Sequence, residues 1–241
     1  MREIVKNKNL TMLGHLAELR KRMLYIVIAN LVTTFICYEY SNSLIEIFLK
    51  MNKSMKLVYL TPPELFLAYL KISLIGGVIL ASPITILQIW TFVSPGLYKG
   101  ERLYIVGSFI GGLLFFITGG YFAYKMVLPT MLEFFQKFQR DEIAQMISIG
   151  SYLDFILSII FTFGIVFEMP ILAALLAKLK LIKAKTLRKK QPIMILIIFI
   201  VAAVMTPPDI ISQIMLALPM ILLLQLSIGI CWLINRYQEE Q

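Results

Sequence analysis

The chain has 241 residues, of which 59% are hydrophobic and 15% charged, and its formal net charge is +9. Soluble domains contain roughly 45–50% apolar and 25% charged residues, so the composition excludes an ordinary soluble protein and indicates a polytopic membrane protein. The positive charge alone would be compatible with nucleic-acid binding, but its distribution along the chain, described below, argues against that function.

The fold class that we predict is an all-α polytopic membrane protein, with one membrane domain formed by residues 1–241. Residues 1–22 are predicted to form an amphipathic cytoplasmic helix, because leucines recur there at every third position from Leu10 to Leu19. Six transmembrane helices are expected, with short fifth and sixth spans. The predicted spans are residues 23–40, 65–90, 103–128, 152–177, 192–205 and 210–234.

The connecting segments alternate in charge. Sixteen Lys and Arg residues fall in the N-terminal region, the predicted loops 91–102 and 178–191 and the C-terminal tail 235–241. Only five fall in the opposite loops, which are predicted at 41–64, 129–151 and 206–209. Because cytoplasmic loops are enriched in Lys and Arg, both termini are expected to be cytoplasmic. The basic charge is therefore largely a signal of membrane topology.

Helix-start patterns mark three of the expected spans. Thr61 and Glu64 enclose two prolines, which is typical of a capping box at the start of span two. Thr206 and Asp209 repeat this pattern before span six, and Ser151 and Asp154 form a similar box at the start of span four.

The short loop at residues 92–102 (FVSPGLYKGER) contains a Ser-Pro-Gly turn followed by Glu101 at the entry of span three. A carboxylate at a helix N-terminus is favoured by the helix dipole, which is one interpretation of Glu101. The alternative is that Phe92 and Glu101 face a cationic partner. Glu18 allows the same two interpretations, because it either pairs with Arg22 one helical turn away or binds an external cation.

Glu168 lies deep within span four, beside Pro170. An ionisable group at this depth costs about 2.5–3.5 kcal/mol on insertion scales, so it is expected to face a bundle interior or a water-filled cavity. Pro170 predicts a helix kink at this point. Gln213 and Gln225 are the natural intramembrane hydrogen-bond partners if the carboxyl group is instead satisfied by a neighbouring helix.

Four motifs together resemble those of the TatC family, the multi-spanning receptor subunit of the twin-arginine protein translocase. They are HLAELRKR at 15–22, FVSPGLYKGER at 92–102, FEMP at 167–170 and TPPDIISQ at 206–213. Their order and the expected topology match the family along the whole chain.

The resemblance implies a non-enzymatic receptor, without a cofactor or a metal, in the bacterial cytoplasmic membrane. It would bind twin-arginine signal peptides and, with TatA/TatB-type single-span membrane proteins, export folded proteins using the proton-motive force. It would also be a homo-oligomer in the complex, embedded in the lipid bilayer. The residues implied for signal-peptide binding are Glu18, Arg20, Phe92 and Glu101.

The resemblance further implies that Glu168 is an intramembrane polar residue on a concave face. It also implies that Thr206 and Gln213 contact a partner helix, and that Asp209 belongs to an extracytoplasmic cap at the same place. The main alternative function is a proton-coupled secondary transporter of a small solute, with Glu168 as its coupling group. Against it, the sequence lacks an inverted repeat with paired broken helices. The sequence contains no set of catalytic residues for an intramembrane enzyme, because the single histidine, His15, does not lie at bilayer depth, where it could act as the base for a serine.

Overall fold

The computed structural model describes residues 12–51, 57–93, 99–138, 146–206 and 209–239, with only the backbone described at 12–13, 93, 99–103 and 239. These residues are almost wholly helical. The elements are α1 (Met12–Glu39), α2 (Ser41–Leu49), β1 (Leu57–Val58), α3 (Pro62–Val93), α4 (Lys99–Phe122), the π-helical segment η2 (Ala123–Val127), α5 (Leu128–Gln136), β2 (Ile147–Ser148), α6 (Ile149–Phe167), α7 (Met169–Lys178), α8 (Ala184–Met205) and α9 (Ile210–Glu239).

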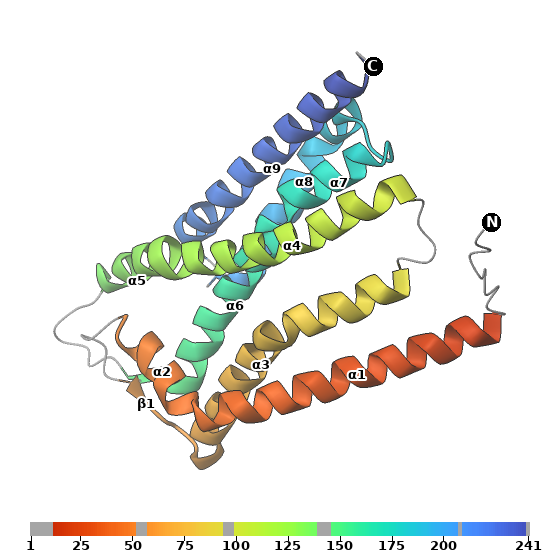
Figure 1. The fold of residues 1–241 in the computed structure, drawn as a ribbon. Coiled ribbons are helices and arrows are strands. Elements are labelled where there is room, and N and C mark those ends of the chain that lie inside the picture. Colours follow the sequence, from red (N-terminus) through yellow and green to blue (C-terminus); the bar gives the residue numbers. More distant parts are fainter. Residues whose placement is uncertain (1–11, 52–56, 94–98, 139–145, 207–208, 240–241) are drawn as a thin grey trace.

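The helices form two packed groups that meet at one end of the molecule. α1 packs along α3, whereas α4 packs on α6 and α7, and α9 packs on α7 and α8. The first turns of α1, α4 and α8 and the last turns of α3, α7 and α9 point toward the same side, which we call the terminal end (Figure 1). α2, β1 and the first turn of α9 lie at the opposite end, which we call the α2 end (Figure 1).

Within the described part of the chain, five helical segments are long and apolar enough to cross a membrane: Gly14–Glu39, Pro62–Phe92, Tyr104–Gln136, Ile149–Lys178 and Ile210–Gln238. The fifth predicted span lies within α8, which is not among them, because four cations occupy its first seven residues. α9 has 30 residues, so the sixth predicted span is not short as a helix.

Three predicted boundaries differ from the structure. α1 is one continuous helix, so the N-terminal amphipathic segment is not separate from the first span; between Gly14 and Glu39 it contains no proline or glycine that would break it. The third helix continues through η2 and α5 to Gln136, because Pro129 falls in the first turn of α5, where its missing N–H is tolerated. α8 begins at Ala184 within the predicted loop 178–191, because Lys and Arg favour helix.

The predicted helix-start patterns act partly as expected. The Ser212 N–H donates to Asp209 Oδ1 at 2.7 Å, so Asp209 caps α9. Thr206 instead ends α8, where its hydroxyl donates to the Ala202 carbonyl at 2.9 Å. α6 is capped by Ser148 and not by Ser151, since the Ser148 hydroxyl accepts from the Ser151 N–H.

Two close helix crossings depend on glycine. At Gly119 of α4 an added Cβ would lie 2.5 Å from the Phe163 carbonyl oxygen, and at Gly164 of α6 it would lie 2.7 Å from the Phe116 ring. At Gly77 of α3 a Cβ would lie 2.6 Å from Thr34 Cα. The lack of a side chain at Gly119 therefore allows α4 and α6 to approach closely.

Glu64 joins two connections at the α2 end. Its Oε2 accepts from the N–H groups of Leu60 (2.7 Å) and Thr61 (3.3 Å), which confirms the carboxylate half of the predicted capping box. Its Oε1 accepts from the Gly150 N–H at 2.8 Å and from the Ser148 hydroxyl. The same connections pair as a short parallel ladder, with Leu57 opposite Ile147. One carboxylate therefore fixes the starts of both α3 and α6.

We expect Glu64→Gln to lower the melting temperature of the purified protein by several degrees. The glutamine amide has only one acceptor oxygen, so it can accept hydrogen bonds at the start of α3 or at the start of α6, but not at both. Thermal unfolding in detergent, followed by circular dichroism, would measure the change. Glu133→Gln is the matched control, since Glu133 is exposed on α5. Equal melting temperatures for the two variants would contradict the bridging role of Glu64.

Candidate functional site

A polar cluster lies at the terminal end, where α1 packs on α3. Arg22 donates to Glu18 Oε1 through Nε (3.1 Å) and Nη2 (2.5 Å), and its Nη1 donates to Gln88 Oε1 at 3.2 Å. The Glu18 and Arg22 side chains are only 25% and 18% exposed. The i, i+4 pairing of Glu18 with Arg22 is therefore present, and it extends to a residue of α3.

An aromatic contact adjoins this cluster. The rings of His15 in α1 and Phe92 in α3 lie edge to face, with centroids 5.9 Å apart. This arrangement is favourable for aromatic pairs. His15, Arg22 and Gln88 were not selected as site residues from the sequence. Only the long-range packing of α1 on α3 brings them together with Glu18 and Phe92.

Two other predicted ligand-binding residues lie differently. Arg20 is exposed and, with Leu16, Leu19 and Met23, lines a shallow groove on the outer surface of α1. It does not share the face of Glu18. Glu101 lies in the first turn of α4, and its side chain is outside the described residues.

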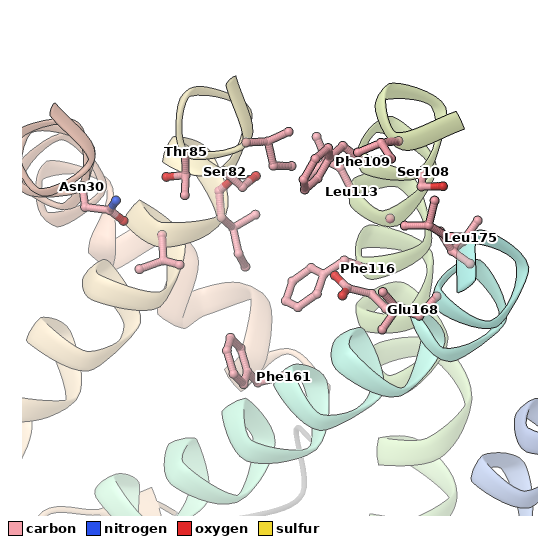
Figure 2. Close-up of a pocket in the computed structure, with 17 residues that line it drawn as sticks. Asn30, Ser82, Thr85, Ser108, Phe109, Leu113, Phe116, Phe161, Glu168 and Leu175 are labelled. Atoms are coloured by element: carbon pink, nitrogen blue, oxygen red, sulfur yellow. Dashed lines mark hydrogen bonds between the residues drawn. The ribbon is translucent and has the colours of Figure 1, made fainter. Parts of the chain in front are cut away.

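Glu168 lies at the break between α6 and α7, directly before Met169 and Pro170, so the kink predicted from Pro170 is confirmed. Its carboxylate lines a groove of ≈ 420 Å³ bounded by α1, α3, α4, α6 and α7. Figure 2 shows Glu168 beside Phe116, with the polar side chains of Ser82 and Thr85 on another wall. The groove is mainly apolar with a few inward polar groups, as is typical of binding sites within membrane bundles.

The glutamines expected to satisfy Glu168 have other positions. Gln213 Nε2 donates to the Phe199 carbonyl of α8 at 2.9 Å, and Gln225 is exposed on α9. The prediction of a glutamine partner was wrong, because Gln213 lies near the start of α9, at the α2 end, and bonds to the adjacent helix instead. Asp209 Oδ2 and Ser212 Oγ are buried without a hydrogen-bond partner among the described residues.

A second groove, of ≈ 530 Å³, shares Val78 and Phe161 with the first and extends along α3 and α6. Its wall contains an ion pair between Lys71 of α3 and Asp154 of α6, with Nζ 2.8 Å from both carboxylate oxygens. Both side chains are about half exposed. Asp154 therefore links two helices, a role that its helix-start pattern did not predict.

Comparison with protein families decides between the functions left open by the sequence. The family model for the Sec-independent protein translocase protein (TatC) matches residues 14–219. The chain belongs to the TatC family. The matched range contains the TatC motifs around Glu18, Glu101, Glu168 and Gln213. Membership in this family favours protein translocation over the alternative of a small-solute carrier.

Similar proteins agree over nearly the full length. The chain is 39% identical over 229 residues to the Sec-independent protein translocase protein TatC of Carboxydothermus hydrogenoformans, covering 94% of each chain. It is 39% identical over 221 residues to TatC of Helicobacter pylori, covering 92% of this chain and 87% of the relative. A crystal structure of the twin-arginine translocase receptor TatC superposes with a TM-score of 0.80 at 34% identity, covering 92% of this chain and 99% of that one.

Proposed function

We propose that this chain is the signal-peptide receptor of a twin-arginine protein translocase. It binds paired arginines at its terminal end and works with TatA/TatB-type single-span proteins to export folded proteins at the expense of the proton-motive force. Its site is the bacterial cytoplasmic membrane, with both termini in the cytoplasm. The observation that carries the proposal is the carboxylate of Glu18, held beside the His15–Phe92 contact on a surface that TatC motifs define.

The chemistry of this surface suits a guanidinium ligand. A planar guanidinium group binds a carboxylate through two parallel hydrogen bonds and stacks on aromatic rings, whereas an ammonium group does neither. Glu18 supplies the carboxylate and Phe92 the ring, and both are partly buried. We propose Glu101 as the second carboxylate, because the first turn of α4 lies at the same end of the molecule as Glu18 (Figure 1). Arg20 acts at the edge of this surface, on the outer face of α1.

We propose the α2 end as the contact for a partner transmembrane helix, through Thr206, Gln213 and the cap formed by Asp209. The support is the buried Asp209 Oδ2 and Ser212 Oγ, which have no partner among the described residues and would accept or donate a hydrogen bond to an incoming helix. Glu168 then forms the polar part of the groove between the two helix groups. Several copies of the chain assemble in the working complex.

Binding of a synthetic signal peptide to the purified protein tests the receptor role. The Arg-Arg peptide is expected to bind at least 10-fold more tightly than the same peptide with Lys-Lys. Glu18→Gln and Glu101→Gln are each expected to weaken Arg-Arg binding about 10- to 100-fold, because each removes a charge-assisted hydrogen bond. Isothermal titration in detergent measures both effects.

Glu133→Gln controls for the loss of one negative charge, since Glu133 is exposed on α5, toward the α2 end. It is expected to leave the affinity within twofold of the unmodified protein. If all variants bound both peptides equally, the assignment of Glu18 and Glu101 would be wrong, and the two residues would serve only as a helix pair and a helix cap.

A further inference from the structure

The second groove, between α3 and α6, carries two opposite charges on otherwise mainly apolar walls. Lys71 of α3 and Asp154 of α6 form the ion pair on its wall, in the part of each helix that is nearer the α2 end (Figure 1). Leu67 and Leu70 extend the apolar wall on one side of Lys71. On the other side the groove continues toward the middle of both helices between large apolar side chains, namely Leu74, Ile75, Val78, Leu157 and Phe161. The groove thus combines a pair of charges with space for an apolar chain.

The ion pair leaves hydrogen-bonding groups free on both residues. Lys71 Nζ lies 2.8 Å from each carboxylate oxygen of Asp154, so at most two of its three N–H groups are used. A carboxylate accepts about four hydrogen bonds, so Asp154 also retains free positions. Both side chains are about half exposed. A ligand in the groove can therefore bind a positive donor and a negative acceptor without breaking the ion pair.

The two charges cancel, and this determines the kind of headgroup that the groove selects. A purely anionic headgroup is attracted by Lys71 but repelled by Asp154, so it gains little Coulomb energy. A headgroup with a phosphate and a primary amine, two carbon atoms apart, is attracted by both residues and forms a charge-assisted hydrogen bond with each. A quaternary ammonium group such as that of choline has no N–H, so it cannot donate to Asp154.

The dimensions of the groove fit one acyl chain in one leaflet. From Lys71 to Val78, and equally from Asp154 to Phe161, the helix rises about 10 Å at 1.5 Å per residue. One leaflet occupies half of the hydrocarbon core, or about 15 Å, so this length lies within it. The groove volume of ≈ 530 Å³ is in the usual range for ligand sites. A headgroup bound at the ion pair therefore directs its acyl chain along the groove, toward the middle of the bilayer.

We propose that the second groove is a binding site for phosphatidylethanolamine. Lys71 donates its remaining N–H to the phosphate, the ammonium group donates to Asp154, and one acyl chain lies between α3 and α6. A partner transmembrane helix suits this groove less well, because an apolar helix would remove both half-exposed charges from water. Helix contacts in membranes also favour small residues, whereas Leu74, Val78 and Phe161 are large.

Native mass spectrometry of the full-length protein in detergent tests the proposal, with lipids that share the same acyl chains. Phosphatidylethanolamine is expected to bind about 10-fold more tightly than phosphatidylcholine or phosphatidylglycerol, because only its headgroup makes both charge-assisted hydrogen bonds. In the N-methylated series between phosphatidylethanolamine and phosphatidylcholine, affinity is expected to fall most with the third methyl group, which removes the last N–H. Equal binding of the three lipids by the unmodified protein would overturn the proposal.

Asp154→Asn is expected to reverse the preference, because it removes the partner of the amine and leaves Lys71 as an unpaired cation. Phosphatidylethanolamine affinity is expected to fall about 10-fold, and phosphatidylglycerol is expected to become the tighter ligand. Glu46→Gln is the matched control, since it removes the anion of the exposed Lys50–Glu46 pair on α2. It is expected to leave the order of the three affinities unchanged. An equal change in both variants, or no change in either, would exclude a site at Asp154.

A photo-reactive residue at Leu74 identifies the occupant of the groove in a membrane, because Leu74 is half exposed on the groove wall. In bacterial membranes that contain phosphatidylethanolamine, it is expected to capture this lipid, and Asp154→Asn is expected to reduce the capture. Capture of a protein at Leu74 in place of lipid would overturn the proposal.

Discussion

Gly119→Ala is expected to lower the free energy of unfolding by about 1–3 kcal/mol, the usual cost of overpacking a tight contact. A Cβ at Gly119 would lie 2.5 Å from the Phe163 carbonyl oxygen and 2.8 Å from Phe167 Cβ. The first of these atoms is backbone, so α4 and α6 would have to separate. Unfolding of the purified protein by titration with a denaturing detergent measures the loss.

Gly107→Ala is the matched control, because Gly107 lies in the same helix and has no atom within 4 Å of the added Cβ. It is expected to leave stability unchanged or to raise it by about 0.5–1 kcal/mol, since alanine loses less backbone entropy in a helix. If the two alanine variants behaved alike, the close crossing at Gly119 would be contradicted.

Removing one partner of the Lys71–Asp154 ion pair is expected to destabilise the protein by about 1–2 kcal/mol, less than the cost of an unpaired charge at the centre of a membrane helix, because both side chains are about half exposed. The pair joins α3 to α6 on the wall of the second groove. Lys71→Met and Asp154→Leu would each leave the opposite charge without its partner. The double variant is expected to recover most of the loss, because it leaves no charge to solvate.

The double-mutant cycle gives the coupling energy, which is expected to be about 1–3 kcal/mol. The Lys50–Glu46 pair provides the comparison, since it lies on one helix, with both side chains about two-thirds exposed. Its coupling is expected to be only about 0.3–0.5 kcal/mol. Additive effects of Lys71→Met and Asp154→Leu would show that the two charges are solvated independently.

The sequence predicts those features of the fold that depend on local chemistry. The break at Glu168 follows from Pro170, and the cap on α9 follows from Asp209, since both effects act within one turn. Periodicity and apolar length also identify the helices that contain the five long apolar segments. In each case the determining residues lie next to the structure that they determine.

Features that depend on contacts between distant segments were missed. Nothing near Lys71 or Asp154 indicates that they meet across 83 positions. The pairing of Leu57 with Ile147 and the convergence of Arg22 with Gln88 are equally non-local. The early start of α8 was missed for another reason: the charge of Lys185, Arg188 and Lys189 was interpreted as a loop signal, although these residues are good helix formers.

In the proposed receptor, Arg22 competes with the ligand for the carboxylate of Glu18. Oε1 of Glu18 already accepts two hydrogen bonds from Arg22, and that guanidinium is also tied to Gln88. A ligand that engages both carboxylate oxygens must exchange with Arg22. An incoming guanidinium group can replace the two hydrogen bonds of Arg22 with an equivalent bidentate pair. An ammonium group offers only a point charge and therefore does not displace Arg22. A single arginine in the ligand therefore gains little binding free energy at Glu18. Tight binding requires a second arginine that binds a second carboxylate. The hydrogen bonds of Arg22 thus make the protein discriminate between a pair of arginines and a single cation.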